Sequence, residues 1–205
     1  GMGMKIPSPD SLIYIIKELI KIESKLVLDA SALVPEVLES ISGTNTIVTP
    51  HLGEYKRMFQ DPYNHNKMSF AEPTRTKRDM LEEHALNVCS IAKKYGITII
   101  LKGYHNIICD GHTTVGQQKR AAVIKRTTPA MTVGGCGDVL CGVVAGLFSK
   151  ISDGFYASIT AVYLTGMAGN LAHQKLGLHM TATDLIEQLP HTMKSFDKII
   201  FNSQQ

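Results

Sequence analysis

Residues 128–142 read TPAMTVGGCGDVLCG, and the rest of the chain is best interpreted outward from this stretch. Three glycines, Gly134, Gly135 and Gly137, fall within four residues and permit backbone angles and close approaches that a β-carbon would block. Asp138 follows them, and then comes an apolar run with small residues inside it. The pattern predicts a glycine loop that enters the N-terminus of a buried helix.

Such a loop is suited to hold an anion. The first amides of a helix have no partner within it and carry the positive end of the dipole, so the loop makes a cradle for phosphate. Asp138 would be a carboxylate at the edge of this cradle. Donors beside a base are what phosphoryl transfer to a hydroxyl requires. Asp138 could equally be an acid that offsets the helix dipole, so the remaining motifs must decide.

The composition is that of an ordinary globular protein. The chain has 205 residues, of which 44% are hydrophobic and 19% charged, with a formal net charge of +3. This length suits one domain, which we take as residues 1–205. The basic residues form no long run, and no apolar run reaches membrane-spanning length. We therefore expect neither nucleic acid nor a membrane as a partner.

The number and spacing of the cysteines indicate the cellular compartment of the chain. The chain has four, without a CxxC pair: Cys89, Cys109, Cys136 and Cys141. With no signal-peptide pattern, this usage predicts free thiols and a cytoplasmic location.

Short apolar runs alternate with segments of helical spacing. Strands are expected at 26–30, 46–49 and 97–101, and a hairpin-type pair at 106–109 and 121–125. Helices are expected over 10–22, with Asp10 or Ser11 as N-cap, and over 34–41, 53–59, 76–94, 139–150, 154–174 and 181–189. Residues 61–74 are expected to form an exposed loop, and the tail from His191 is weakly specified.

This alternation predicts an α/β sandwich around a mostly parallel sheet, in which ligands bind beyond the carboxyl ends of the strands. Polar clusters then fall at one edge of the sheet: Asp29, Thr49-Pro50-His51, Lys102-Gly103 and the loop 134–138. Each cluster alone is weak, but their convergence at one edge favours a functional site.

Motifs in the same order along the chain resemble those of the NAD(P)H-hydrate dehydratase family, which has a ribokinase-like fold. They read VLDASAL at 27–33, TPHLGE at 49–54, LKG at 101–103 and PAMTVGGCGDVL at 129–140, and the likeness continues through 161–169 and 178–190. The resemblance implies a ribokinase-like α/β/α sandwich. It begins part-way through the family's fold, so the chain is expected to be N-terminally short and to lack the earlier strands. The open sheet edge could then be covered by a homo-oligomer.

The resemblance also implies an activity. The family repairs NADH and NADPH that have been hydrated on the nicotinamide ring, and uses ADP or, in some members, ATP. The ring hydroxyl takes the terminal phosphoryl group, and phosphate then leaves as the ring double bond reforms. Hydroxide is a poor leaving group and phosphate a better one, which explains why a dehydratase would use a phosphate cradle. The implied cofactor is Mg²⁺, with ADP or ATP as co-substrate.

The reacting groups are assigned position by position from this resemblance. Asp138 matches the base that deprotonates the hydroxyl, and it also contacts the hydrate. Gly135, Cys136 and Gly137 match the anion hole, which acts through backbone amides, although Cys136 stands where the family usually has Thr.

The remaining assignments concern the two substrates and the metal. The expected hydrate contacts are His51 and Gly3, and Glu54 matches an acid linked to Mg²⁺ through water. The expected nucleotide contacts are Lys102, Gly103, Tyr104, His105 and Asn106, together with Gly137. The Tyr104-His105-Asn106 part replaces a smaller, glycine-containing segment of the family, which leaves the choice between ADP and ATP open.

Alternatives stand beside these assignments. His51 could cap a helix, Lys102 could be solvated at a strand end, and Glu54 could pair with a helix dipole. A small-molecule kinase of the same fold, acting on a vitamin-precursor alcohol, would share the phosphoryl step, although such kinases usually have Asn in place of His51. A third possibility is a nucleotide-binding module without activity.

Overall fold

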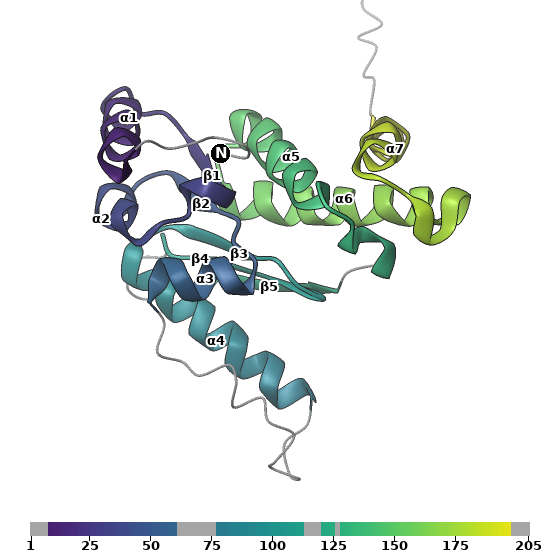
Figure 1. Ribbon diagram of the computed structural model, residues 1–205, viewed down its shortest axis with the longest axis horizontal. Coiled ribbons are helices and arrows are strands. Elements are labelled where there is room, and N and C mark those ends of the chain that lie inside the picture. Colours follow the sequence, from purple (N-terminus) through teal and green to yellow (C-terminus); the bar gives the residue numbers. More distant parts are fainter. Residues whose placement is uncertain (1–7, 61–76, 113–119, 126–127, 198–205) are drawn as a thin grey trace, which may run out of the picture.

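The structure is a computed structural model that describes residues 8–60, 77–112, 120–125 and 128–197 (Figure 1). Its strands are β1 Leu26–Leu28, β2 Thr46–Val48, β3 Thr98–Leu101, β4 His105–Asp110 and β5 Ala121–Lys125. Its helices are α1 Pro9–Lys21, α2 Leu38–Ile41, α3 Leu52–Phe59, α4 Lys77–Tyr95, α5 Cys136–Lys150, α6 Gly154–Leu176 and α7 Ala182–Lys194. The loop expected at 61–74 and the expected contact Gly3 lie outside the described residues.

The strands form one sheet in the order β1-β2-β3-β4-β5. The pairs β1–β2 and β2–β3 are parallel, whereas β3–β4 and β4–β5 are antiparallel. The sheet is therefore mixed, and the expectation of a mostly parallel sheet holds only for β1–β3. The reason lies in the short turn between Leu101 and His105, because a parallel return requires a crossover of a dozen or more residues.

Helices cover both faces of the sheet (Figure 1). Ile99 and Ile107 belong to the core cluster shared with α1, α3 and α4. Their chain neighbours Ile100 and Ile108 belong to the cluster shared with α5 and α6. Since successive side chains of a strand point to opposite faces, these alternate memberships define three layers. The predicted α/β/α sandwich is confirmed.

A third cluster fixes the start of α5, where the glycine loop ends. Met180 and Leu185, beside and within α7, pack with Cys136 of α5 and Ala168 of α6. The loop is thereby held between α6 and α7. None of the helices among the described residues is long and apolar enough to cross a membrane.

Two helix boundaries differ from those predicted. The N-cap of α1 is Ser8, whose hydroxyl accepts from the Ser11 amide, rather than Asp10 or Ser11, because Pro9 is well suited to the first helical position. Helix α7 runs past Pro190 to Lys194 instead of ending at residue 189. Pro190 is exposed and Thr192 beyond it is buried, so water can hydrate the carbonyl that the proline frees while packing continues the helix.

The prediction that the four cysteines are free thiols is partly wrong. Cys89 of α4 and Cys109 of β4 form a disulfide, with their α-carbons 5.1 Å apart. Cys136 and Cys141 are free thiols, as expected. The pair lies 20 residues apart in sequence, and only the packing of α4 against β4 brings the two sulfurs together.

Candidate active site

The polar clusters predicted at one sheet edge do meet there. Beyond the strands, the Thr49 amide donates to the Leu28 carbonyl at 3.0 Å, and the Lys102 amide donates to the Pro50 carbonyl at 2.8 Å. An isolated parallel bridge pairs His51 with Lys102. The ladder thus continues past the carboxyl ends of β1, β2 and β3 and holds the segments after them side by side.

Lys102 is the centre of the charged groups at this edge. Its ammonium Nζ lies 2.7 Å from Oδ1 of Asp29 and 4.0 Å from Oε2 of Glu54. The lysine side chain is only 14% exposed, and that of Asp29 only 2%. Lys102 is therefore a largely buried, paired cation, and the alternative of a solvated lysine at a strand end is wrong.

The glycine loop leads into α5 as predicted. Gly135 is the N-cap, with φ of +93°, a left-handed conformation that favours glycine. A β-carbon built on Gly137 would lie 3.3 Å from Nζ of Lys102, which places the ammonium directly beside the first turn of α5. Among the described residues, no hydrogen bond occupies the amides of Gly137 and Asp138, so they are available to an anion.

Asp138 lies on the exposed side of the first turn of α5. Cys141 lies three positions further on, so the two share one face of the helix. Burial raises the pKa of the Cys141 thiol, the Asp29 charge raises it further, and Lys102 and Thr49 act in the opposite direction. The charges of Asp29 and Lys102 thus act on Cys141, and Asp138 precedes Cys141 by about one turn of the same helix.

Thr49 contributes a buried hydroxyl to this edge. Its Oγ1 has no hydrogen-bond partner of normal geometry among the described residues. The Thr49 hydroxyl acts to lower the pKa of the Cys141 thiol, against the effect of burial.

His51 and Glu54 form a capping box at the start of α3. His51 Nδ1 accepts from the amides of Gly53 at 3.0 Å and Glu54 at 3.2 Å, and Glu54 Oε2 accepts from the His51 amide at 2.8 Å. The capping alternative is therefore realised for His51, and Glu54, for which pairing with the helix dipole was the alternative, is the acid in the first turn of α3 that closes the same box. Because Nδ1 is an acceptor, the proton of the neutral imidazole resides on Nε2, which lies 3.5 Å from Glu54 Oε1 on a side chain that is 60% exposed.

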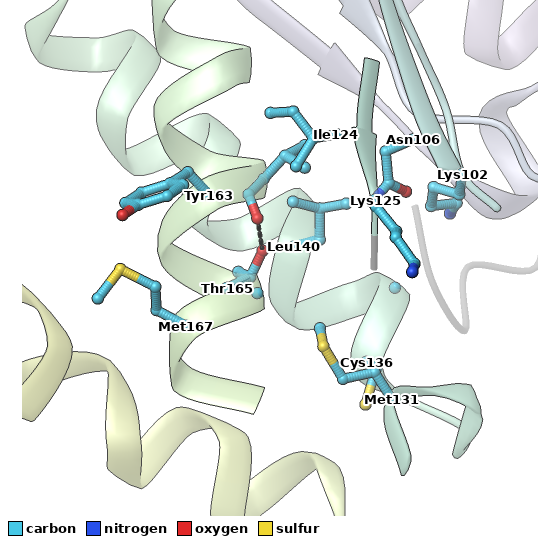
Figure 2. A pocket seen from close by; sticks show the side chains of 13 residues that line it. Lys102, Asn106, Ile124, Lys125, Met131, Cys136, Leu140, Tyr163, Thr165 and Met167 are labelled. Carbon is cyan, nitrogen blue, oxygen red and sulfur yellow. Dashed lines mark hydrogen bonds between the residues drawn. The ribbon is translucent and has the colours of Figure 1, made fainter. Parts of the chain in front are cut away.

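A pocket opens between the loop, the hairpin β4–β5 and α6 (Figure 2). Lys102, Asn106, Cys136 and Gly137, all predicted site residues, line it. The Gly103 amide donates to Oδ1 of Asn106 at 3.3 Å, which fixes the turn between β3 and β4.

The rest of the predicted nucleotide segment lies beside this pocket. Tyr104 is exposed and sits edge-on to His105, with ring centroids 4.8 Å apart. Lys125 Nζ lies 5.5 Å from the Tyr104 ring centroid and also lines the pocket. The aromatic residues of the turn are thus tied to β5.

The apolar wall of the pocket could not be predicted from the sequence. This wall comes from η4 Pro129–Thr132, β5 and α6, and includes Ile124, Met131, Val162 and Met167, with the Thr165 side chain among them (Figure 2). Such residues read as ordinary core in a sequence. The only signal was Thr165, a buried hydroxyl in an apolar helix, which in the structure donates to the Ala161 carbonyl at 2.7 Å.

The described residues contain no dedicated metal cage. No group of three or more His, Cys, Asp or Glu side chains is placed to hold a metal among them. Asp29 and Glu54 already face Lys102, and Glu54 also accepts from the His51 amide. This donor set fits Mg²⁺ only in the mode in which one carboxylate acts through water and substrate phosphates supply the other ligands.

A three-layer sandwich with a glycine loop and helix N-terminus beside the strand ends defines a ribokinase-like protein. A ribokinase-like superfamily protein of Enterococcus faecalis superimposes with a TM-score of 0.61 at 22% identity, over 96% of this chain and 62% of that one. The ADP/ATP-dependent NAD(P)H-hydrate dehydratase of Bacillus subtilis, co-crystallized with ATP/Mg²⁺ and soaked with CoA, superimposes with a TM-score of 0.67 at 25% identity, over 85% of this chain and 57% of that one.

The chain belongs to the NAD(P)H-hydrate dehydratase family, whose sequence profile matches residues 1–191. The ADP-dependent (S)-NAD(P)H-hydrate dehydratase of Nitrosopumilus maritimus is 42% identical over 201 residues, which cover 98% of this chain and 62% of that protein. The chain thus spans about 62% of the length of this relative. The family resemblance inferred from the motifs is confirmed.

Proposed function

We propose that this chain carries out the nucleotide-driven dehydration of hydrated NADH or NADPH. One observation carries the proposal: the Lys102 ammonium lies beside Gly137 in the first turn of α5, where the amides of Gly137 and Asp138 have no acceptor among the described residues. A cation and a helix N-terminus together make a strong site for a phosphoryl group. Asp138 follows Gly137 directly and is exposed to a substrate that approaches the edge.

In the proposed reaction the Asp138 carboxylate accepts the proton of the ring hydroxyl. The freed oxygen attacks the terminal phosphorus of ADP, and the bond from that phosphorus to the bridging oxygen breaks, which releases AMP. The phosphorylated ring then expels phosphate as the neighbouring C–H bond supplies its electrons to the new double bond. The products are AMP, inorganic phosphate, NAD(P)H and a proton.

The anion hole stabilises charge on the transferring group. The amides at Gly135, Cys136 and Gly137 are proposed to face the phosphoryl oxygens, which requires the Cys136 amide to exchange its 3.4 Å hydrogen bond to the Val133 carbonyl for the phosphate; main-chain donors are insensitive to the replacement of Thr by Cys136. Cys136 is buried in the cluster between α5, α6 and α7, so its thiol serves packing. Lys102 supplies the fixed positive charge at the same place.

The nucleotide is proposed to occupy the pocket behind this anion hole. Its apolar wall of Met131, Val162 and Met167 suits a base, while Asn106 and Lys125 offer polar groups at its margin. Gly103, Tyr104 and His105 then shape the turn that leads from Lys102 to Asn106. Phosphates that enter from this pocket would meet Gly137 and Lys102, which line it.

The hydrate is proposed to bind at the other side of the edge. His51 presents Nε2–H on an exposed side chain, held in one orientation by the capping box. Glu54 is proposed to act on Mg²⁺ through water, where the ion would neutralise phosphate charge. Gly3, the other proposed contact with the hydrate, lies outside the described residues.

The direct test incubates the chain with hydrated NADH, Mg²⁺ and either ADP or ATP, and follows the recovery of NADH absorbance. We expect recovery with at least one nucleotide, with stoichiometric release of phosphate. Recovery without any nucleotide would contradict the phosphoryl route. A phosphorylated alcohol as the stable product would favour a kinase, and nucleotide binding without turnover would favour an inactive module.

We also propose an assembly and a location for the chain. Ile15 and Leu19 of α1 and its C-cap Ile22 form an exposed apolar stripe, and β1 is an edge strand among the described residues. These features support a homo-oligomer, which light scattering after size-exclusion chromatography would test. A cytoplasmic location is proposed from the free thiols of Cys136 and Cys141, against which stands the disulfide of Cys89 and Cys109, a bond that is rare in the cytosol; cell fractionation would test it.

A further inference from the structure

Asp29 is a deeply buried carboxylate at the strand-end edge. It follows β1 directly, and its side chain is 2% exposed. A carboxylate removed from water requires a charged or hydrogen-bonded partner, and Oδ1 of Asp29 accepts from Lys102 Nζ at 2.7 Å. The burial of Asp29 is therefore coupled to the position of Lys102.

The place where Asp29 holds Lys102 is electrostatically unusual. The ammonium lies beside Gly137 in the first turn of α5, where the helix dipole is positive and a cation is disfavoured. Asp29 on one side and Glu54 at 4.0 Å offset this repulsion. An ammonium has three N–H donors, so Lys102 can keep Asp29 and still donate to a phosphoryl oxygen.

We propose that Asp29 is a positioning residue: it fixes the Lys102 ammonium over the first turn of α5 and thereby promotes phosphoryl transfer rather than nucleotide affinity. This inference rests on the proposed function. Without the Asp29 charge, Lys102 regains rotamer freedom and leaves the helix end, so a preorganised donor is lost in the transition state. The site also becomes more positive by one charge, so the bound nucleotide is not weakened.

The test is a double-mutant cycle on Asp29 and Lys102, with turnover and ADP binding measured separately. Asp29→Asn keeps the size of the side chain, and we expect kcat to fall about 10–100-fold while the Kd for ADP changes less than about threefold. Lys102→Met lowers both turnover and binding. In the Lys102→Met background, Asp29→Asn should cause no further loss of kcat, because the residue acts through Lys102.

Asp110→Asn is the matched control. Asp110 is also a buried carboxylate with a cationic partner, Arg120 at 3.0 Å, but it lies at the opposite edge of the sheet, where it pairs with Thr98 at the start of β3. Its replacement should lower thermal stability and leave kcat unchanged. If Asp29→Asn fails to fold, Lys102→Arg serves instead: the larger guanidinium keeps the ion pair but moves the charge, and kcat should fall with binding retained.

A second readout does not depend on activity. Acylation of the Lys102 amine, followed by mass spectrometry of its peptide, should be slow in the parent chain and faster in Asp29→Asn. An unchanged acylation rate would overturn the anchoring role alone. A parent chain that binds ADP but converts no hydrate would overturn the proposed function instead. Equal loss of kcat on Asp29→Asn in both backgrounds, or full activity of Asp29→Asn, would show that Asp29 does not act through Lys102.

Discussion

A β-carbon at Gly135 would lie 2.8 Å from the β-carbon of Ala182, so the glycine turn before α5 packs directly against the first turn of α7. Gly135 also has φ of +93°, where L side chains are strained. Gly135→Ala should therefore lower the free energy of unfolding by about 1–3 kcal/mol. Urea denaturation followed by circular dichroism would measure it.

The neighbouring glycine is a matched control for this change. A β-carbon at Gly134 meets nothing within 4 Å. Gly134→Ala should be nearly neutral, and the double variant Gly135→Ala with Ala182→Gly should recover only the part of the loss that comes from the clash. Equal destabilisation at both glycines would show that the contact with α7 is not the cause.

Asp138→Asn should reduce turnover by about 10²–10⁴-fold, the usual cost of removing a positioned base. Because Asp138 is exposed, its replacement should leave the folded state and ADP binding nearly unchanged. Steady-state kinetics with hydrated NADH and calorimetric titration with ADP would separate the two effects.

Asp184→Asn distinguishes a base from an acid that merely stabilises a helix end. Asp184 occupies the first turn of α7 and closes a capping box with Thr181. Its replacement should lower stability and leave turnover intact. Loss of activity in both variants to the same extent would point to helix stability, and full activity of Asp138→Asn would remove Asp138 from the role of base.

Gly137→Ala tests the contact between α5 and Lys102. The added methyl would lie 3.3 Å from Nζ, which the ion pair with Asp29 holds in place, so the methyl crowds the ammonium. ADP affinity should fall about tenfold, and the usual gain of about 0.5–1 kcal/mol for a glycine-to-alanine change in a helix should be offset by strain on this ion pair. Gly142→Ala, where nothing lies within 4 Å, should give the stability without the loss of affinity.

The spacing of apolar residues and the positions of glycines and prolines were sufficient to predict the three layers. The β-branched run around Ile99 and Ile100 predicts a buried strand, and its residues pack into the apolar clusters on both faces of the sheet. The direction of β4 was less accessible, because a hairpin and a crossover differ only in the length of the turn after Leu101. The prediction that α7 ends at residue 189 was wrong, because Pro190 is tolerated on the exposed face of the helix.

The candidate site was predictable in part, for the same physical reason. Strand ends in a parallel unit meet at one edge, so Asp29, His51 and Lys102 could be placed together from their positions after strands. The ion pair between Lys102 and Asp29 could not be predicted, because its distance of 2.7 Å depends on side-chain rotamers that no sequence pattern encodes. The disulfide of Cys89 and Cys109 could not be predicted either, because the packing of a helix on the face of a sheet imposes no fixed spacing in the sequence.

His112 should make stability depend on pH at the edge of the sheet opposite the candidate site. Its Nδ1 lies 2.8 Å from Oδ1 of Asp110 and its Nε2 lies 3.0 Å from the Thr44 carbonyl, so both ring nitrogens face acceptors. Only the imidazolium can donate to both. The hydrogen bond to Asp110 raises the pKa of His112 above 6.5, against the effect of burial and with a further contribution from Thr44, while Arg120 nearby opposes it.

A raised pKa in the folded state means that the stabilisation is fully present below the ordinary value of 6.5 and is lost as the pH rises through the folded value. For Asp110, burial acts to raise the pKa, but the hydrogen bonds of His112 and the charges of His112 and Arg120 outweigh it and hold the pKa below 3.8. The aspartate contribution is therefore lost only in acid. The pair of His112 and Asp110 should stabilise the chain most between pH 3.8 and pH 6.5, the ordinary pKa values of the two groups.

Urea unfolding of the parent chain and of His112→Gln at about pH 6 and about pH 9 would measure this dependence. We expect His112→Gln to be less stable than the parent at the lower pH and the difference to shrink at the higher pH. A stability difference that grows with pH would mean that His112 is held neutral, with only one of its two hydrogen bonds formed.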